Sequence, residues 1–235
     1  MLPYARRVKL GFVSKHELYF PPIKRALLTL QASHDATYVT DFEELVKRDQ
    51  NFDYVFFPHF SKLVPKSFYS RFVCVGFHVG NLPEDRGGSP IQNKILRGEY
   101  KTFVNAFKID SSIDGGPVYE QKEIDLETGN ITQIIENVSQ VIASMIAKIV
   151  SEKTEPIPQL SSPTRFRRLT KKDSKFNFGE LSVKQIFDRI RMVDGLDYPR
   201  AELECQSKLF KFTNARLENE VLVFECEVRN DPEKR

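Results

Sequence analysis

The sequence predicts an α/β fold: a Rossmann-like, mostly parallel sheet with helices on both faces, followed by a small C-terminal α+β extension. Three observations predict this fold. Strand-like and helix-like patterns alternate through the first half of the chain. A long amphipathic helix pattern occupies residues 130–153. Beyond a proline-bearing stretch, another helix pattern is followed by three strand-like segments.

The first half reads as strands separated by helices. Short runs rich in apolar and β-branched residues predict four strands, at residues 7–14, 37–40, 53–57 and 72–75. Pro21 opens a stretch with one apolar face, which predicts the first helix. Asp41, with Glu44 three positions later, predicts a capped second helix, and residues 65–71 predict a short third. Such alternation is typical of parallel strands joined by helices.

The middle of the chain predicts two further strands, at residues 100–109 and 118–124, and then the longest helix. Over residues 130–153 apolar residues recur mostly at intervals of three and four. We therefore expect this stripe to pack in the core and to close the larger domain. The first half lacks a Gly-x-Gly-x-x-Gly phosphate loop, so we do not expect a dinucleotide cofactor.

The predicted domain organisation is a larger domain at 1–153, a linker at 154–164 and an extension at 165–235. Prolines mark the linker. In the extension, residues 182–193 form an amphipathic helix pattern. The three strand-like segments after it lie at residues 201–205, 208–213 and 221–228.

Composition and charge limit the classes of function. A chain of 235 residues can hold one full-sized α/β domain with a small appendage. A formal net charge of +3 argues against an electrostatic nucleic-acid binder. The three cysteines lie far apart and no residue set has metal-ligand spacing, so we expect neither a disulfide framework nor a metal site. No apolar run has the length of a membrane span and no signal-peptide pattern is present, so we expect a cytoplasmic protein without a membrane partner.

The stretch at residues 76–119 carries the candidate chemistry. The apolar run at 72–75 ends at a glycine and leads to His78, which is followed by a loop and a helical pattern opened by Ser89 and Pro90. Further on, Asp114 stands directly before a glycine pair. Ligands of open α/β sheets bind at strand ends of this kind. A histidine and an aspartate in such positions are the components of a proton-transfer site.

These motifs resemble the signature of the 10-formyltetrahydrofolate-dependent formyltransferases. The signature reads Asn-x-His-x-Ser-Leu-Leu-Pro, then Arg-Gly, a small pair, Pro-Ile and a helix ending in Gly. The residues that match it are His78, Leu82, Pro83, Arg86, Gly87, Pro90, Ile91 and Gly98. Residues 113–118 resemble the second family motif, Leu-Asp-Thr/Gly-Gly. Where the family has Asn, two residues before the His, this chain has Gly76.

The resemblance implies acyl transfer from a folate nitrogen to an amine through a tetrahedral intermediate. His78 would then stabilise the oxyanion or move protons, and Asp114 would orient His78 or a water molecule. The family Asn supplies an amide to the carbonyl oxygen, which glycine cannot do. Two amides could replace it, and we favour Asn105, on a strand, over Asn81, in the loop.

The cosubstrate implied by the resemblance is 10-formyltetrahydrofolate. Residues 57–65 resemble the family segment that lines the pteridine pocket, which points to Phe57, His59, Phe60 and Leu63 as cofactor-binding candidates. A second group, Arg86 and Gly87, precedes a helix and could hold a carboxylate or a phosphate. An ordinary strand-to-helix loop and a surface arginine are the competing interpretations.

Several acceptors fit such an enzyme, and we favour a nucleotide-linked amino sugar. A methionyl-tRNA formyltransferase usually carries a longer, basic C-terminal barrel, whereas the basic run near residue 165 is offset here by six glutamates at positions 202–227. A glycinamide ribonucleotide formyltransferase would have an N-terminal phosphate loop, which we do not find. A non-catalytic binding protein on the same fold stays open because of Gly76. The β-rich extension is compatible with a homodimer.

Overall fold

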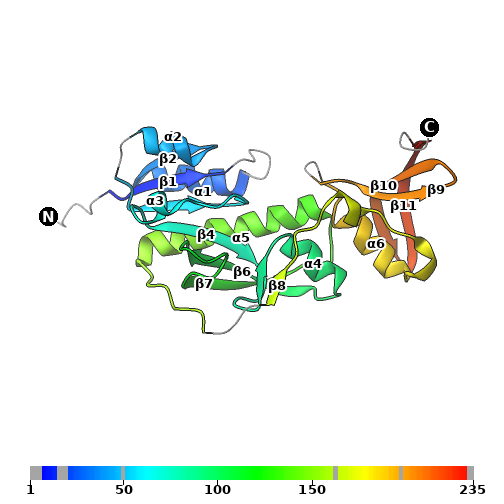
Figure 1. Ribbon diagram of the computed structural model, residues 1–235. Coiled ribbons are helices and arrows are strands. Elements are labelled where there is room, and N and C mark those ends of the chain that lie inside the picture. The colour runs from blue at the N-terminus through cyan, green and yellow to red at the C-terminus, as the bar shows by residue number, and fades with distance from the viewer. Residues whose placement is uncertain (1–6, 15–20, 49–50, 161–163, 196–197, 232–235) are drawn as a thin grey trace. The chain divides into compact units, whose positions relative to one another are not determined.

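The computed structural model describes residues 7–14, 21–48, 51–160, 164–195 and 198–231 (Figure 1). The chain divides into two compact units, each built from segments that are discontinuous in sequence. The first unit comprises Met1–Gly87, Thr102–Ile124 and Glu136–Arg165. The second comprises Gly88–Lys101, Asp125–Ile135 and Phe166–Arg235. The second unit thus takes in two segments that lie within the larger domain predicted from the sequence.

The first unit contains a six-stranded sheet in the order β2-β1-β3-β4-β6-β7. Its strands are β1 (Lys9–Val13), β2 (Asp35–Val39), β3 (Tyr54–Phe57), β4 (Cys74–Val79), β6 (Lys101–Lys108) and β7 (Val118–Asp125). The pairs β1–β2, β1–β3 and β3–β4 are parallel, and β4 pairs antiparallel with β6. The predicted Rossmann-like, mostly parallel sheet is therefore confirmed.

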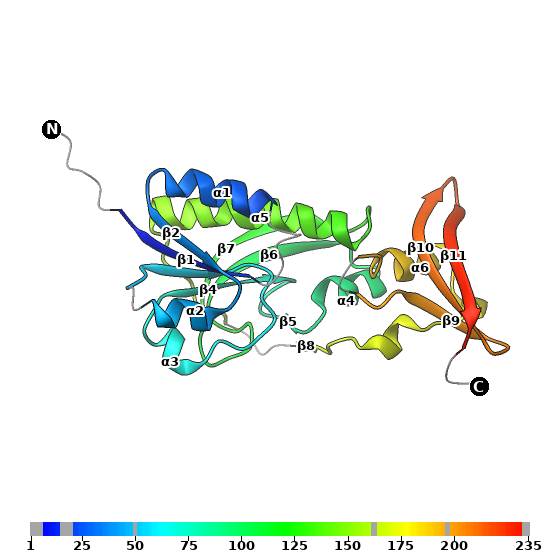
Figure 2. The same cartoon turned by 90° about the horizontal axis from the view of Figure 1, so that it is seen from above.

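Helices cover both faces of this sheet (Figure 2). Along one face lie α1 (Pro21–Gln31) and α5 (Ile131–Glu152), and on the other lie the short helices α2 (Phe42–Lys47) and α3 (Lys66–Tyr69). As predicted, Asp41 caps α2, and its carboxylate accepts a hydrogen bond from the backbone N–H of Glu43 at 3.1 Å. This cap satisfies one of the orphan donors of the first turn.

Helix α5 corrects the expectation from the sequence that no apolar stretch has the length of a membrane span. Among the described residues it is the one helix that is long and apolar enough to cross a membrane. Its apolar stripe is nevertheless buried within the fold, with Ile142, Met145, Ile146 and Ile149 at 0–1% exposure. An amphipathic helix with its apolar side covered in this way is a core helix.

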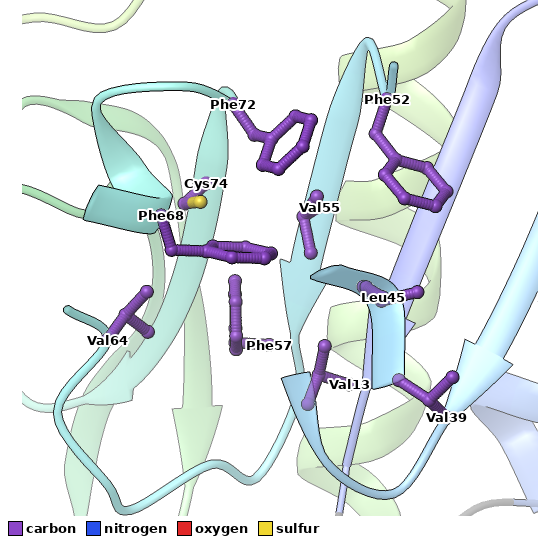
Figure 3. Close-up of a cluster of buried hydrophobic side chains, with 10 residues drawn as sticks. All are labelled: Val13, Val39, Leu45, Phe52, Val55, Phe57, Val64, Phe68, Phe72 and Cys74. Atoms are coloured by element: carbon purple, nitrogen blue, oxygen red, sulfur yellow. The ribbon is translucent and has the colours of Figure 1, made fainter. Parts of the chain in front are cut away.

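A mainly aromatic and aliphatic cluster fills the space between the sheet and helices α2 and α3 (Figure 3). Phe57 of β3 and Phe72 both lie near the ring of Phe68, with centroids 6.1 and 5.0 Å from it. Cys74 lies in the same cluster, and burial raises the pKa of its thiol to about 12. The cluster includes the last residue of β3, Phe57, and the first residue of β4, Cys74, so it anchors these two neighbouring strands against the helices.

The second unit is built around an antiparallel sheet in the order β11-β10-β9. Its strands are β9 (Ala201–Cys205), β10 (Lys208–Glu218) and β11 (Val221–Asn230), and its helices are α4 (Pro90–Leu96) and α6 (Val183–Arg191). Four phenylalanines (Phe176, Phe178, Phe212 and Phe224) pack together beside this sheet. Two single-turn 3₁₀ helices, Lys171–Ser174 and Phe178–Glu180, precede α6. A separate short ladder pairs β5 (Asp85–Gly87) with β8 (Thr164–Phe166), and all of it except Phe166 belongs to the first unit.

Candidate active site

His78 lies at the end of β4, one residue before the strand ends at Val79, as the sequence pattern predicted; the strand itself extends beyond its predicted end at Val75. Its imidazole is 6% exposed and both ring nitrogens have partners. Nε2 lies 2.5 Å from the backbone carbonyl oxygen of Asp85, and Nδ1 lies 3.5 Å from Oδ2 of Asp114. Because a carbonyl oxygen can only accept, Nε2 carries the proton, and Nδ1 faces the carboxylate.

Asp114 lies in the loop between β6 and β7, in a left-handed backbone conformation with φ of 51°. Its Oδ2 also accepts a hydrogen bond from the backbone N–H of Gly87 at 3.0 Å. Two residues on, a Cβ at Gly116 would lie 1.7 Å from the carbonyl oxygen of Lys108, so only glycine fits there. The second motif therefore shapes a loop that returns the aspartate toward β4.

The space beside Gly76, where the family has an Asn side chain, is filled by other side chains. The backbone at this position is covered by the ring of Phe107 and the side chain of Ile109. A Cβ on Gly76 would lie 2.7 Å from Cζ of Phe107, closer than real Cβ contacts allow. An aromatic ring on the neighbouring strand β6 thus occupies the space into which a side chain at position 76 would extend.

The two candidate replacements for the missing amide have other partners. The Asn105 side chain is fully buried, and its nitrogen donates to the carbonyl oxygens of His78 and Gly80 at 3.1 and 2.7 Å. Its oxygen accepts from Nε2 of Gln121 at 2.6 Å. The Asn81 side-chain oxygen accepts from the hydroxyl of Thr102 at 3.1 Å. Direct action of either amide on a substrate stays a prediction, whereas Asn105 holds the backbone at His78 and just beyond the end of β4 at Gly80.

A cavity of about 330 Å³ lies beside the His78–Asp114 pair, entirely within the first unit. Asp114 and the β4 residues Gly76 and Phe77 form part of its wall. Phe57, Phe60 and Leu63, three of the predicted cofactor-binding residues, line it as well. The cavity combines aromatic rings, the ammonium groups of Lys62 and Lys66, and the carboxylates of Asp110 and Asp114. Such a mixture suits a flat, partly aromatic ligand with both polar and charged groups.

The other three cofactor-binding candidates do not line this cavity. Nε2 of His59 lies 2.7 Å from the hydroxyl of Ser139, on α5. Arg86 is 9% exposed and donates through Nε and Nη2 to Oε1 of Gln159, at 3.1 and 2.7 Å. The N–H of Gly87 is the donor to Asp114 described above. Arg86 and Gly87 therefore contact Gln159 and Asp114 instead of lining the cavity. Binding of the cosubstrate by these residues stays a prediction.

Sequence reasoning missed several residues that shape the site. Phe107, Ile113 and Asp110 line the cavity, and Gln159 reaches the Asp114 loop from the segment expected to be a linker. Asp110 could have been found from the sequence, because it lies shortly before the Asp-Gly-Gly motif. Nothing local distinguishes Phe107 or Gln159, because their roles come from chain segments that meet only after folding.

The chain is similar in sequence to known formyltransferases. The family model described as "Methionyl-tRNA formyltransferase, C-terminal domain" matches residues 171–229. The methionyl-tRNA formyltransferase of Campylobacter jejuni subsp. jejuni serotype O:2 is 28% identical over 184 residues, which cover 77% of this chain and 54% of that protein. The chain therefore spans about half the length of the curated relatives it matches.

Solved structures extend the comparison to the fold. The methionyl-tRNA formyltransferase from Clostridium thermocellum is 30% identical, with a TM-score of 0.88 over 95% of this chain and 99% of that one. A sugar N-formyltransferase from Shewanella has a TM-score of 0.62 at 14% identity, over 86% of this chain and 94% of that one, which is a likeness of fold alone. The six-stranded sheet, the C-terminal extension and the two motifs around His78 and Asp114 are together those of a formyltransferase. The chain belongs to the folate-dependent formyltransferase family.

Proposed function

We propose that this protein transfers a formyl group from 10-formyltetrahydrofolate to the amino group of a nucleotide-linked amino sugar. The observation that carries the proposal is the His78–Asp114 pair, 3.5 Å apart, with Asp114 in the wall of a cavity. A carboxylate with an imidazole behind it can accept a proton from an incoming amine and keep the charge stabilised.

The chain's own groups divide the chemistry between them. Asp114 faces the cavity and would take the proton that the amine loses on attack. With its Nε2–H held by the Asp85 carbonyl, His78 would share that proton through its unprotonated Nδ1, and the resulting imidazolium would stabilise the Asp114 carboxylate. The proton would return through Asp114 to the folate nitrogen that leaves when the tetrahedral intermediate breaks down. The N–H of Gly87 keeps Asp114 turned toward His78. The folate, when bound, would supply the formyl group.

The cavity supports the folate assignment through its chemistry. A pterin is a flat ring with several donors and acceptors, and the rings of Phe57, Phe60 and Phe107 provide apolar surface for it. The carboxylate of Asp110 is an acceptor for amino groups of such a ring. Lys66 provides a cation for the glutamate carboxylates that a folate carries, and Lys62, which is paired with Asp41 at 3.3 Å, lies in the same wall.

The charge arrangement of the second unit supports a small acceptor. Several of its cations are paired with carboxylates of the same unit, namely Arg167 with Asp173, Lys175 with Glu204, Arg200 with Asp194 and Lys211 with Glu202. The Arg167 guanidinium holds the pKa of the Asp173 carboxyl below its usual range. Cations that are neutralised internally contribute little to binding a polyanion, since that depends on releasing counterions from phosphates.

A second candidate acceptor is a charged initiator tRNA. It is favoured by one specific observation, the match of residues 171–229 to the C-terminal domain of methionyl-tRNA formyltransferases. If that match reflects a shared acceptor, the paired cations would have to exchange their carboxylate partners for phosphates.

The two candidates are separated by a direct assay. The purified chain is incubated with 10-formyltetrahydrofolate and either a panel of nucleotide-linked amino sugars or methionyl-tRNA. Folate turnover is followed by absorbance and formylation of the acceptor by mass spectrometry. We expect turnover with an amino sugar and its loss in His78→Ala. Turnover with methionyl-tRNA alone would establish the second candidate. Folate binding without any turnover, unaffected by His78→Ala, would identify a non-catalytic binding protein.

A further inference from the structure

The segment expected to be a linker runs along the sheet edge next to the candidate site. After α5 ends at Glu152, the chain returns and pairs with the first residue of β7. The N–H of Val118 donates to the carbonyl oxygen of Ile157 at 2.7 Å, and the N–H of Ile157 donates to that of Val118 at 2.8 Å. This antiparallel bridge places Ile157 against β7, the outer strand of the sheet, and brings Gln159 to the loop before β7.

The apolar side chains of this segment are exposed and its polar Gln159 is partly buried, which is the reverse of what a hydrophobic contact would give. Ile157 is 72% exposed and Leu160 is 94% exposed. Gln159, between them, is partly buried and makes four hydrogen bonds. Hydrophobic burial therefore does not hold the segment in place, and its polar contacts do.

The contacts of Gln159 have one consistent orientation. Its nitrogen donates to the backbone carbonyl oxygens of Asp114 and Gly116, at 3.0 and 2.7 Å. Its oxygen accepts from Nε and Nη2 of Arg86, at 3.1 and 2.7 Å. Because a guanidinium only donates and a carbonyl only accepts, the reversed amide would lose all four bonds. The buried Arg86 thus fixes which end of Gln159 faces the Asp114 loop.

The loop needs such a restraint. Asp114 has a left-handed φ of 51°, a conformation that costs free energy for a residue with a side chain. The two residues after it, Gly115 and Gly116, have no side chains with which to anchor this part of the loop. Gln159 bridges the carbonyls on both sides of Gly115, so it holds the turn from which the Asp114 carboxylate extends toward His78.

We propose that Gln159 is a positioning residue for Asp114, and that residues 157–160 act as a strap which, with Arg86, completes the candidate site. The catalytic consequence rests on the proposed formyl transfer, whereas the structural consequence does not. The strap carries no group that touches the reacting atoms. It sets the direction of the Asp114 carboxylate, to which the rate of a proton transfer is sensitive.

The test uses the full chain and two substitutions that act differently. Gln159→Met keeps the side chain's approximate length and removes all four hydrogen bonds. Gln159→Glu keeps the acceptor for Arg86 and replaces the donor by a second acceptor facing two carbonyl oxygens. Leu160→Ala is the matched control, since it changes an exposed side chain of the same strap.

The first readout is independent of any substrate. The N–H of Gly87 is bonded to the Asp114 carboxylate, so its hydrogen-exchange rate reports where that carboxylate lies. We expect exchange at Gly87 to be about tenfold faster in both Gln159 variants, the scale of one hydrogen bond, and unchanged in Leu160→Ala. Amides of β1 and β3 should exchange as in the wild type, which excludes general unfolding. Unchanged exchange at Gly87 in both variants would overturn the inference.

The second readout is kinetic. With the acceptor found in the panel above, kcat should fall by about ten- to a hundredfold in both Gln159 variants, while KM for the folate changes little. A rise in KM with kcat unchanged would assign Gln159 to ligand binding and contradict a positioning role. Should the wild type show no turnover while Gly87 exchange responds as expected, the proposed function fails and the strap's positioning role stands.

Discussion

At the scale of single residues, position 76 separates this chain from its family motif. The space in which the family Asn would extend is filled by Phe107, whose Cζ would lie 2.7 Å from a Cβ on Gly76. The glycine and the phenylalanine therefore form a matched pair. A side chain at position 76 would therefore require the Phe107 ring to move.

Gly76→Asn tests this pairing. We expect the substitution to destabilise the protein by about 1–3 kcal/mol, because it overpacks a rigid contact within the sheet. Urea denaturation gives the free energies of unfolding. Gly98→Asn is the control, since nothing lies within 4 Å of its Cβ position and its φ of 71° is one that Asn tolerates.

Combining Gly76→Asn with Phe107→Leu completes a double-mutant cycle. If the clash is the cause, the double variant should be more stable than the sum of the two single effects predicts, by more than about 0.5 kcal/mol. Strictly additive effects would show that Phe107 does not exclude the side chain.

Asp114→Asn tests the proton-accepting role. The amide keeps the shape of the carboxylate and removes its basicity, so we expect kcat for formyl transfer to fall by about 10²–10⁴-fold with the fold intact. Asp110→Asn is the comparison, because Asp110 lines the same cavity but is assigned to folate binding, so there KM for the folate should rise while kcat changes little. Equal losses in the two variants would remove the special role of Asp114.

At the scale of elements, periodicity predicted most of the structure. Helix α5 was expected at residues 130–153 and is observed at Ile131–Glu152, because its apolar spacing reflects one buried face. Strand β10 was expected to end at Thr213 and continues to Glu218, because pairing with β11 extends it through a more polar stretch. The meeting of Gln159 with the Asp114 loop was not predictable, since it depends on a bridge between chain segments far apart in sequence.

Helix α6 carries a buried ion pair that can be tested within the second unit. Arg191 is 1% exposed, donates to Asp188 at 2.6 Å, and also donates to the carbonyl oxygens of Leu126 and Gly129. Asp188→Asn would leave the buried guanidinium without its carboxylate. We expect a loss of about 3–5 kcal/mol in the free energy of unfolding, measured in urea. The exposed Glu180→Gln should change it by less than about 0.5 kcal/mol.

Tyr100 offers a second readout of the same cluster. Burial, followed by the hydrogen bond from its hydroxyl to Asp188 at 2.6 Å, raises the pKa of Tyr100 to about 12. The folded chain holds this proton more tightly than the unfolded one, where the pKa is near 10. Its contribution to stability is thus full below pH 10 and is lost as the pH rises toward 12. In Asp188→Asn the ultraviolet titration of the phenol should move to lower pH, and an unchanged titration would contradict the assignment.

At the scale of the whole molecule, the sequence predicted the sheet and the extension but placed the boundary between them at one stretch of chain. The second unit also contains Gly88–Lys101 and Asp125–Ile135. Within it, Arg191 and Asp188 hold Leu126, Gly129 and Tyr100 through the bonds described above. Local patterns do not show such grouping, because it is created by polar contacts between segments that each look like part of the larger domain.

The balance of charge over the molecule makes a prediction about salt. The formal net charge is +3 and several cations of the second unit are paired with carboxylates. We therefore expect the protein to neutralise few phosphates when the acceptor binds. A protein that neutralises six to ten phosphates loses about 10³–10⁵ in affinity between about 50 and 200 mM salt. For an acceptor with one diphosphate we expect kcat/KM to fall by less than about tenfold over that range. Measuring kcat/KM of the acceptor against salt, with the folate saturating, checks this. A steep fall would mean that the ion pairs of the second unit open to a polyanion, and the acceptor would then be a nucleic acid instead of a sugar.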